Sequence, residues 1–282
     1  MTTSLSETDQ NSYLSGEVKR YDYDRWLATL YAPPSARQGI FTLLAFHAEI
    51  ARVRETVSEP LLGDIRLQWW RDAVNVIADQ GKPPVHPVAE ALAEIIPAYN
   101  LDPVMLLRMI DVRALDLDPL PFETTGELLD YADQTGGLLN SLVFRISGGT
   151  EKDGEDAARA VGKAYALTGI IRAIPYHVAQ DILRVPDEMI RAQGLTADSL
   201  FSSENRPAFF RIVEELTAKA RHEQETANRL IANRPKSEKP AFRLASLTSL
   251  YLTRLHAAGY DPAHRKMDVG AVRKIAALSL GR

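Results

Sequence analysis

Residues 167–177 are the segment of this chain richest in side chains that could bind an anion. The segment reads Leu-Thr-Gly-Ile-Ile-Arg-Ala-Ile-Pro-Tyr-His and holds Arg172, Tyr176 and His177 close together along a helix. A guanidinium binds phosphate or carboxylate oxygens with a fork of donors, and an imidazole gains its charge near neutral pH. The segment therefore fits an anion-binding site. A helix-end histidine bonded to a carbonyl is the open alternative for His177.

A second group of charges lies at residues 51–55, with the sequence Ala-Arg-Val-Arg-Glu. Arg52 and Arg54 could bind an anionic head group directly, because guanidinium groups can replace a metal ion as the partner of phosphate. The alternative is a solvated face on which the arginines pair with glutamates of the same helix. We favour the solvated face for Arg54, since surface ion pairs are common.

Aromatic residues and glycines provide further candidates for a cavity lining. Tyr131, Tyr165 and Tyr176 could line a lipid cavity, or could be core aromatics with a satisfied hydroxyl group, as we favour for Tyr165. The pair Gly136 and Gly137 could cradle a phosphate, but a helix break with close backbone packing is the better interpretation.

The composition excludes several classes of site. The chain has no cysteine, so it forms no disulfide and no thiolate metal site. Its histidines show no metal-ligand spacing, and no phosphate-binding loop of the Walker type is present. The formal net charge is −4 and no long basic run occurs, so we expect no nucleic-acid partner.

Apolar residues recur at helical spacing over most of the chain, and no segment alternates as a strand would. The spacing predicts a helix over residues 37–57, which Pro60 should end. Further helices are expected at 65–79, 88–98, 103–116, 125–137 with a continuation to 146, 156–174, 207–232, 240–258 and 269–280. We expect a flexible polar tail over residues 1–18 and a single all-α domain over residues 19–282.

The sequence carries no sign of export or of a membrane span. Residues 1–11 contain two acids and no basic residue, unlike a secretory signal or an Arg-rich transit peptide. No window offers about 18 uninterrupted apolar residues. We expect a cytoplasmic protein with at most peripheral contact at the inner membrane face. A mitochondrial location stays open, because an import signal could lie outside this sequence.

Several segments resemble the squalene/phytoene synthase family in their order and spacing. They lie at residues 24–28, 45–55, 67–72, 131–137, 167–177 and 250–261. Residues 131–137, Tyr-Ala-Asp-Gln-Thr-Gly-Gly, are similar to the Tyr-Ala-x-x-Thr-Ala-Gly pattern that lines the family's pocket. The resemblance implies binding roles for Tyr131, Thr135 and Gly136. Arg172 aligns with an arginine that the family retains, which implies a role in the pocket.

The resemblance implies an all-α, isoprenoid (prenyl) synthase-like helical bundle with a central cavity. In that family, two Asp-rich motifs face each other at the cavity mouth and hold Mg²⁺ ions that bridge the diphosphates of the substrates. The aligned positions here are Ala51, Arg52 and Glu55 in the first motif and Ala173 and His177 in the second. One carboxylate is a poor magnesium site, so we expect no metal and no cofactor. Mg²⁺ and a catalytic Glu55 would be needed only if synthase activity remained.

The chain shows a closer resemblance to a divergent branch of the family. Residues 172–177, Arg-Ala-Ile-Pro-Tyr-His, then Val185-Pro186, are similar to this branch, as are residues 57–59, Val-Ser-Glu. The branch includes a phytoene synthase-like mitochondrial assembly factor of respiratory complex I. This implies a role in assembly rather than in isoprenoid synthesis.

Three hypotheses follow. The first is a non-catalytic protein that acts in complex I assembly or binds an isoprenoid lipid, with a prenyl diphosphate ligand or a respiratory complex subunit as its partner. The second is a prenyltransferase that condenses two prenyl diphosphates head to head. The third is a scaffold with a collapsed cavity. The residues expected to bind a ligand are Arg52, Tyr131, Thr135, Gly136, Arg172, Tyr176 and His177.

Overall fold

The computed structural model describes residues 7–120 and 122–280, which form helices and connecting loops and contain no β-strand. The α-helices are α1 (Glu7–Tyr21), α2 (Tyr23–Thr29), α3 (Pro34–Ala51), α4 (Pro60–Gln80), α5 (Pro87–Ala98), α6 (Pro103–Val112), α7 (Thr125–Ala132), α8 (Leu138–Ile146), α9 (Lys152–Val178), α10 (Asp187–Ala192), α11 (Arg206–Ile231), α12 (Leu244–Ala257) and α13 (Ala271–Leu280). Short helical turns are η1 (Arg54–Thr56), η2 (Arg113–Leu117), η3 (Asp133–Gly137), η4 (Ala197–Ser199), η5 (Lys236–Phe242) and η6 (Arg265–Met267). The prediction of an all-α fold is confirmed.

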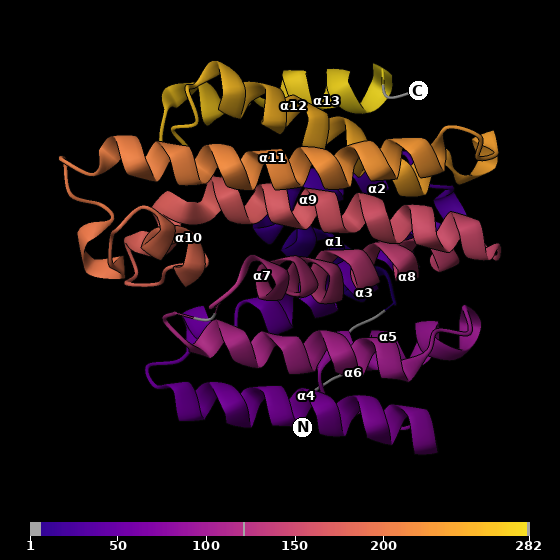
Figure 1. Cartoon of the computed structure of the whole chain (residues 1–282). Helices are drawn as coiled ribbons and strands as arrows, with labels where there is room; N and C mark the ends of the chain where they lie inside the picture. Colours follow the sequence, from indigo (N-terminus) through magenta and orange to yellow (C-terminus); the bar gives the residue numbers. More distant parts are fainter. Residues whose placement is uncertain (1–6, 121, 281–282) are drawn as a thin grey trace.

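Helix α9 runs through the middle of the molecule, with α11 along one side and α7, η3 and α8 along the other (Figure 1). Two glycines allow this close packing. A Cβ atom on Gly136 would lie 2.6 Å from the carbonyl oxygen of Gly162 in α9. Because side chains are missing at both positions, the backbones of η3 and α9 come into direct contact beside the cavity described below.

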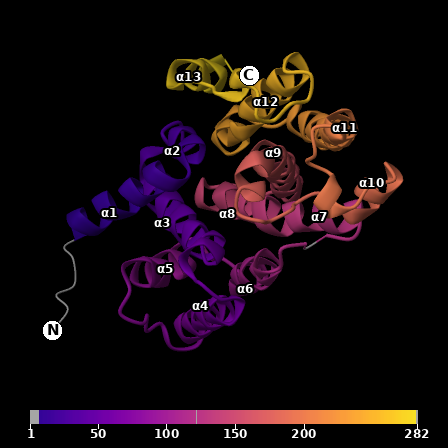
Figure 2. The ribbon, with the colours of Figure 1, turned by 90° about the vertical axis from the view of Figure 1, so that its left-hand side faces the viewer.

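Buried apolar side chains form three groups, and the helices of the first two lie in different parts of the bundle (Figure 2). The first group packs α1, α3, α4, α5, α6 and α8 together and includes Phe46, Leu67 and Met109. The second packs α7, α9, α10, α11 and α12 together and includes Ile171 and Leu216. The third packs α2, α8, α9, α11, α12 and α13 together. Burial of apolar area drives the assembly of all three groups, which hold the helices around the cavity in place.

The end of α3 differs from the sequence prediction. The helix expected over residues 37–57 stops at Ala51, and Pro60 begins α4 rather than ending the preceding helix. Proline suits the first position of a helix, where its missing N–H would have no partner. The turn η1 lies between the two helices and displays Arg54 and Glu55 outside any α-helix.

The amino-terminal region also differs from the expected tail over residues 1–18. Helix α1 begins at Glu7, and its Leu14 and Val18 are fully buried. The side-chain amide of Gln10 donates to the carbonyl of Pro87 at 3.0 Å. Residues 1–6 of the expected tail lie outside the described residues. A short apolar stripe in a polar segment was therefore enough to dock a helix.

Helix α9 extends past Pro175, where the sequence pattern placed its end near residue 174. It ends at Val178, and Asp181 follows with a φ of 57°. The added turn carries Tyr176 and His177 as part of α9. In the described part of the chain, no helix combines the length and apolarity that crossing a bilayer requires.

Candidate functional site

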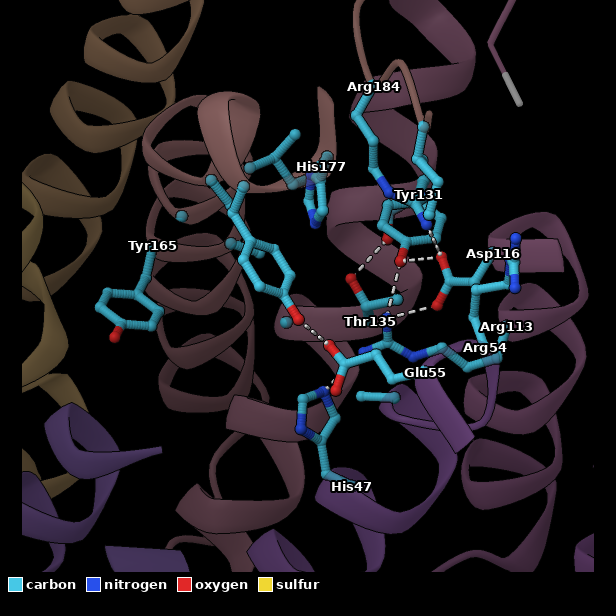
Figure 3. A pocket seen from close by; sticks show the side chains of 18 of the residues that line it. His47, Arg54, Glu55, Arg113, Asp116, Tyr131, Thr135, Tyr165, His177 and Arg184 are labelled. Carbon is cyan, nitrogen blue, oxygen red and sulfur yellow. Dashed lines mark hydrogen bonds and ion pairs between the residues drawn. The ribbon is translucent and has the colours of Figure 1, made fainter. Parts of the chain in front are cut away.

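A cavity of about 290 Å³ opens beside α9 (Figure 3). Its walls come from α2, α3, η1, η2, α7, η3, α9 and the loop after α9. The polar and charged side chains in its lining are Arg25, His47, Arg54, Glu55, Arg113, Asp116, Tyr131, Thr135, Tyr165, Tyr176, His177, Gln180 and Arg184.

Asp116 is the centre of a buried polar network in this cavity. Its carboxylate accepts from Arg113 Nη1 at 3.0 Å, from the Tyr131 hydroxyl at 2.6 Å and pairs with Arg184 Nη2 at 2.9 Å. Arg113 Nη1 also donates to the Tyr131 oxygen at 2.6 Å. Burial raises the pKa of Tyr131, so its hydroxyl keeps its proton and remains a donor. Two guanidinium groups thus share one carboxylate.

His47 extends this network toward α3. Its Nε2 atom lies 2.9 Å from Nη2 of Arg113. Burial, with the charges of Arg113 and Arg25, holds the pKa of His47 well below its usual range. The imidazole is therefore neutral at pH 7, and because a guanidinium only donates, Nε2 must be the acceptor.

At the cavity mouth, a contact between two side chains joins α9 to η1. The hydroxyl of Tyr176 donates to Oε1 of Glu55 at 3.1 Å. The neighbouring His177 is partly buried, and burial followed by the charge of Arg184 lowers the pKa of His177 to about 4. His177 is therefore uncharged at neutral pH, although it faces a wall that contains Asp116.

Three nitrogens of lining residues are buried without a hydrogen-bond partner among the described residues. They are Nε of Arg113, Nδ1 of His177 and Nη1 of Arg184. An unpaired buried donor costs about 1–3 kcal/mol, and more when the group is charged. Arg184 is only 6 % exposed, so bulk water reaches it poorly. An acceptor that reached one of these nitrogens would remove this cost.

The charges of the lining favour an anion as that acceptor. Four arginines, Arg25, Arg54, Arg113 and Arg184, face two carboxylates, Glu55 and Asp116. Arg25 is paired at 2.6 Å with Asp22 outside the lining, so with the histidines neutral the cavity carries an excess of one positive charge. Such an excess, in a partly buried space, attracts a ligand that carries phosphate or carboxylate oxygens.

The structure places six of the eight sequence-predicted site residues in this lining. They are Glu55, Tyr131, Thr135, Gly136, Tyr176 and His177. Thr135 turns its hydroxyl back to the carbonyl of Tyr131 at 2.7 Å and so helps to hold η3. Gly136 is the point of backbone contact with α9. The ligand-binding role of these residues stays a prediction.

Arg52 and Arg172 lie outside the lining. The guanidinium of Arg52 stacks on Tyr21, 3.4 Å from the ring centroid, and its Nε is 3.6 Å from Glu55. The guanidinium of Arg172 stacks on Tyr251 at 3.4 Å. Both arginines are therefore engaged in cation–π contacts.

The contacts of Arg172 belong to a second buried cluster, centred on Asp24. The Asp24 carboxylate accepts from the hydroxyls of Tyr165 and Tyr251, and it lies 2.8 Å from Lys274 Nζ and 3.8 Å from Arg172 Nη1. Burial alone would raise the pKa of Asp24, but the hydrogen bonds from Lys274 and Tyr251 outweigh it and lower that pKa. This cluster ties α13 and α12 to α2 and α9.

Sequence reasoning missed Arg25, His47, Arg113, Asp116 and Arg184. Arg113 and Asp116 lie three residues apart in η2, a spacing that is common on solvated helices and gives no signal of a cavity. Arg184 lies in the loop after α9, directly before the Val-Pro pair that was compared with the divergent branch. Its position next to that pair was the one hint available.

The lining does not fit a magnesium cluster. Ala51 and Ala173 offer no ligand oxygen at the motif positions, and Asp116 is already bound by two arginines. Glu55 is the one remaining lining carboxylate. No cluster of three or more His, Asp or Glu side chains suited to a metal occurs in the described ranges. Magnesium demands near-octahedral oxygen coordination, which this set cannot supply.

Comparison with known proteins shows which family the chain resembles. The sequence profile of the family described as "Squalene/phytoene synthase" matches residues 18–273. A Bos taurus protein named "NADH dehydrogenase (ubiquinone) complex I, assembly factor 6" is 26% identical over 264 residues, which cover 94% of this chain and 79% of the relative. A phytoene synthase of Thermus thermophilus is 27% identical over 197 residues, covering 70% of this chain and 66% of the relative.

Solved structures share the fold. A dehydrosqualene synthase in complex with a ligand superposes with a TM-score of 0.80 at 18% identity and covers 96% of this chain and 95% of that chain. The squalene synthase HpnC from Alicyclobacillus acidocaldarius gives a TM-score of 0.78 at 16% identity, over 90% and 95%. The expected isoprenoid synthase-like bundle is thereby confirmed. Because the family profile spans most of the residues, the chain belongs to the squalene/phytoene synthase family.

Proposed function

We propose that this protein is a non-catalytic member of its family that acts in the assembly of respiratory complex I. The observation that carries the proposal is the cavity mouth. There, Ala51, Ala173 and His177 stand where the family resemblance implies metal-binding aspartates, and Glu55 bonds to Tyr176. Chemistry that ionises a diphosphate needs a divalent cation to stabilise the leaving group, and this mouth is poorly suited to hold one.

The similarity to named relatives also supports a role in complex I assembly. Proteins named complex I assembly factor 6 match over 94% of the chain in Bos taurus and 92% in Rattus norvegicus, whereas the phytoene synthase of Thermus thermophilus matches over 70%. We therefore infer that a complex I subunit or assembly intermediate is the partner, and that the protein works where that complex is assembled, including the mitochondrion if the source is eukaryotic.

The test combines a cellular and a chemical measurement. Deletion of the gene should lower the amount of assembled complex I on a native gel, and the intact gene should restore it. The purified protein, given farnesyl or geranylgeranyl diphosphate and Mg²⁺, should form no condensed product. Product formation that Glu55→Gln abolishes would instead establish the head-to-head prenyltransferase. An unchanged amount of assembled complex I after the deletion would refute the assembly role.

A second function, binding of an anionic isoprenoid lipid in the cavity, is favoured by the excess of positive charge in its lining. A phosphate oxygen would accept from the guanidinium groups of that lining, Arg184 among them, and the apolar side chains of Ala166, Ile170 and Ile182 would contact the isoprenoid chain. The arginines would hold the head group without a metal, since guanidinium forks match phosphate oxygens.

Thermal unfolding in the presence of EDTA tests this function. Farnesyl monophosphate should raise the midpoint of the wild-type protein, because a ligand that binds only the folded state stabilises it. Arg184→Gln should lose the rise. The matched control is Arg191→Gln, because Arg191 is exposed and pairs with Asp187 outside the cavity. A rise that survives Arg184→Gln would refute the assignment of this head-group site.

A further inference from the structure

Helix α4 exposes an apolar stripe on its outer face. The helix lies at the edge of the molecule, and its inner face packs against α5 and α6 through Leu67, Trp70 and Val74 (Figures 1 and 2). The stripe, called the α4 stripe below, consists of Leu61, Leu62, Ile65, Trp69 and Val76, with exposed fractions from 37% to 66%. An apolar surface of this kind on a well-packed helix marks an interaction site.

The spacing of the α4 stripe matches a helix-pairing seam. Leu62, Ile65, Trp69 and Val76 follow one another at steps of three, four and seven residues, the a/d spacing of a two-helix contact. From Leu62 to Val76 the helix rises by about 21 Å. A partner helix of about four turns would cover this length.

A groove beside the stripe offers a place for an apolar side chain. It has a volume of about 290 Å³ and is lined by Trp69, Asp72, Ala73, Val76, Lys82, Pro83 and Pro84. The Trp69 ring is held by edge contacts, with centroid distances of 4.8 Å to Trp70 and 5.4 Å to His86. The two prolines stiffen the opposite wall. The groove is therefore formed in advance, which lowers the entropic cost of docking.

Charges decide what the α4 stripe binds. Asp64, Asp72 and Asp79 are exposed on α4 and have no cationic partner within the described ranges. Asp72 and Asp79, called the aspartate row below, follow Ile65 at steps of seven residues and so continue one of the two residue rows of the seam itself. Burial of this row in an acyl layer would desolvate two carboxylates, which argues against a membrane as the occupant.

A second copy of the chain also fits poorly. A twofold contact pairs equal surfaces, so two α4 helices, parallel or antiparallel, would bring the aspartate row of one copy toward the aspartate row of the other. Arg66 lies on the other side of the stripe and donates to Thr56 at 2.8 Å, and Lys82 lines the groove together with Asp72. We propose that the α4 stripe docks an amphipathic helix of a partner protein, with lysines or arginines where that helix meets the aspartate row. This inference does not depend on the cavity.

Two synthetic helical peptides of about four turns test the proposal. Both carry the same leucine and isoleucine seam, and one has lysines and the other glutamates at the flanking positions. Calorimetry and Trp fluorescence should show that the full-length protein binds the lysine peptide at least about tenfold more tightly. Trp69→Ala should weaken that binding at least about tenfold. The triple variant Asp64→Lys, Asp72→Lys, Asp79→Lys should reverse the preference.

Val272→Ser is the matched control, because Val272 is an exposed apolar residue on α13, far along the chain from the α4 stripe. This variant should bind both peptides as the wild type does. Three results would overturn the proposal. They are equal affinity for the two peptides, binding to phosphatidylglycerol vesicles that Trp69→Ala abolishes, and self-association that Trp69→Ala abolishes.

Discussion

The Tyr176 hydroxyl lies 3.1 Å from Oε1 of Glu55 and donates a hydrogen bond to it. This contact joins residues 51–55 to residues 173–177, the two segments where the family resemblance implies Asp-rich motifs. Where metal ions would bridge those segments in a synthase of this family, a neutral phenol and one carboxylate meet directly. A protein contact that needs no cation therefore joins the two segments at the mouth.

Replacement of Asp116 should strongly destabilise the protein. Asp116→Asn removes the carboxylate that Arg113 and Arg184 share in a buried position. Leaving buried charges unpaired costs about 3–5 kcal/mol. Urea unfolding measures this loss. Asp187→Asn serves as the control, since its pair with Arg191 is exposed and should contribute less than about 1 kcal/mol. Equal losses in the two variants would contradict the network.

Two tyrosine variants separate the buried network from the cavity mouth. Tyr131→Phe removes a hydroxyl that bonds to both Asp116 and Arg113, so we expect a loss of about 1–3 kcal/mol. Tyr176→Phe removes an exposed contact with Glu55 and should cost less than about 1 kcal/mol. Thermal unfolding of both proteins checks the order. A larger loss for Tyr176→Phe would show that the mouth, not the network, holds the cavity.

Stability should fall on acidification. Burial and Arg184 lower the pKa of His177 to about 4, and burial with Arg113 lowers that of His47. In the unfolded chain both imidazoles titrate near pH 6.5. The unfolded state therefore binds more protons as the pH drops from about 6.5 toward 4, and each histidine can remove up to about 1.4 kcal/mol per pH unit.

Urea unfolding between neutral pH and about pH 5 tests this dependence. His177→Gln should reduce the slope of stability against pH, because one of the two depressed groups is gone. An unchanged slope in that variant would mean that His177 titrates normally in the folded protein.

Two glycines of α9 should respond in opposite directions to alanine. A Cβ on Gly162 would overlap the carbonyl oxygen of Gly136, so Gly162→Ala should cost at least about 2 kcal/mol. Gly169 has no neighbour within 4 Å of an added Cβ, and Gly169→Ala should stabilise α9 by about 0.5–1 kcal/mol. Differential scanning calorimetry of both variants checks the signs. Stabilisation by Gly162→Ala would contradict the backbone contact between η3 and α9.

Local sequence signals predict a helix boundary well where a proline marks it. Pro87 and Pro103 start α5 and α6 at their first positions, close to where the apolar spacing placed them. The end of α3 at Ala51 was missed, because no breaker occurs there. Arg52 instead stacks on Tyr21 of α1, and local periodicity contains no such tertiary contact.

The sequence predicted only part of the site, because local patterns do not contain the tertiary contacts that complete it. Tyr176 and His177 share a helix segment whose sequence already looks unusual. Asp116 and Arg184 are separated by several elements, and only the fold brings them within 2.9 Å. Arg172 was expected in the pocket, but its side chain stacks on Tyr251 and does not line the cavity. Sequence spacing does not tell in which direction a side chain points.

Calorimetric titration with a non-hydrolysable farnesyl diphosphate analogue, in Mg²⁺ and separately in EDTA, tests the central claim most directly. If arginines hold the ligand in place of metal ions, the analogue should bind with similar affinity in both buffers, and Arg184→Gln should weaken binding at least about tenfold. Binding that requires Mg²⁺ and survives Arg184→Gln would contradict the account and restore a metal-dependent synthase.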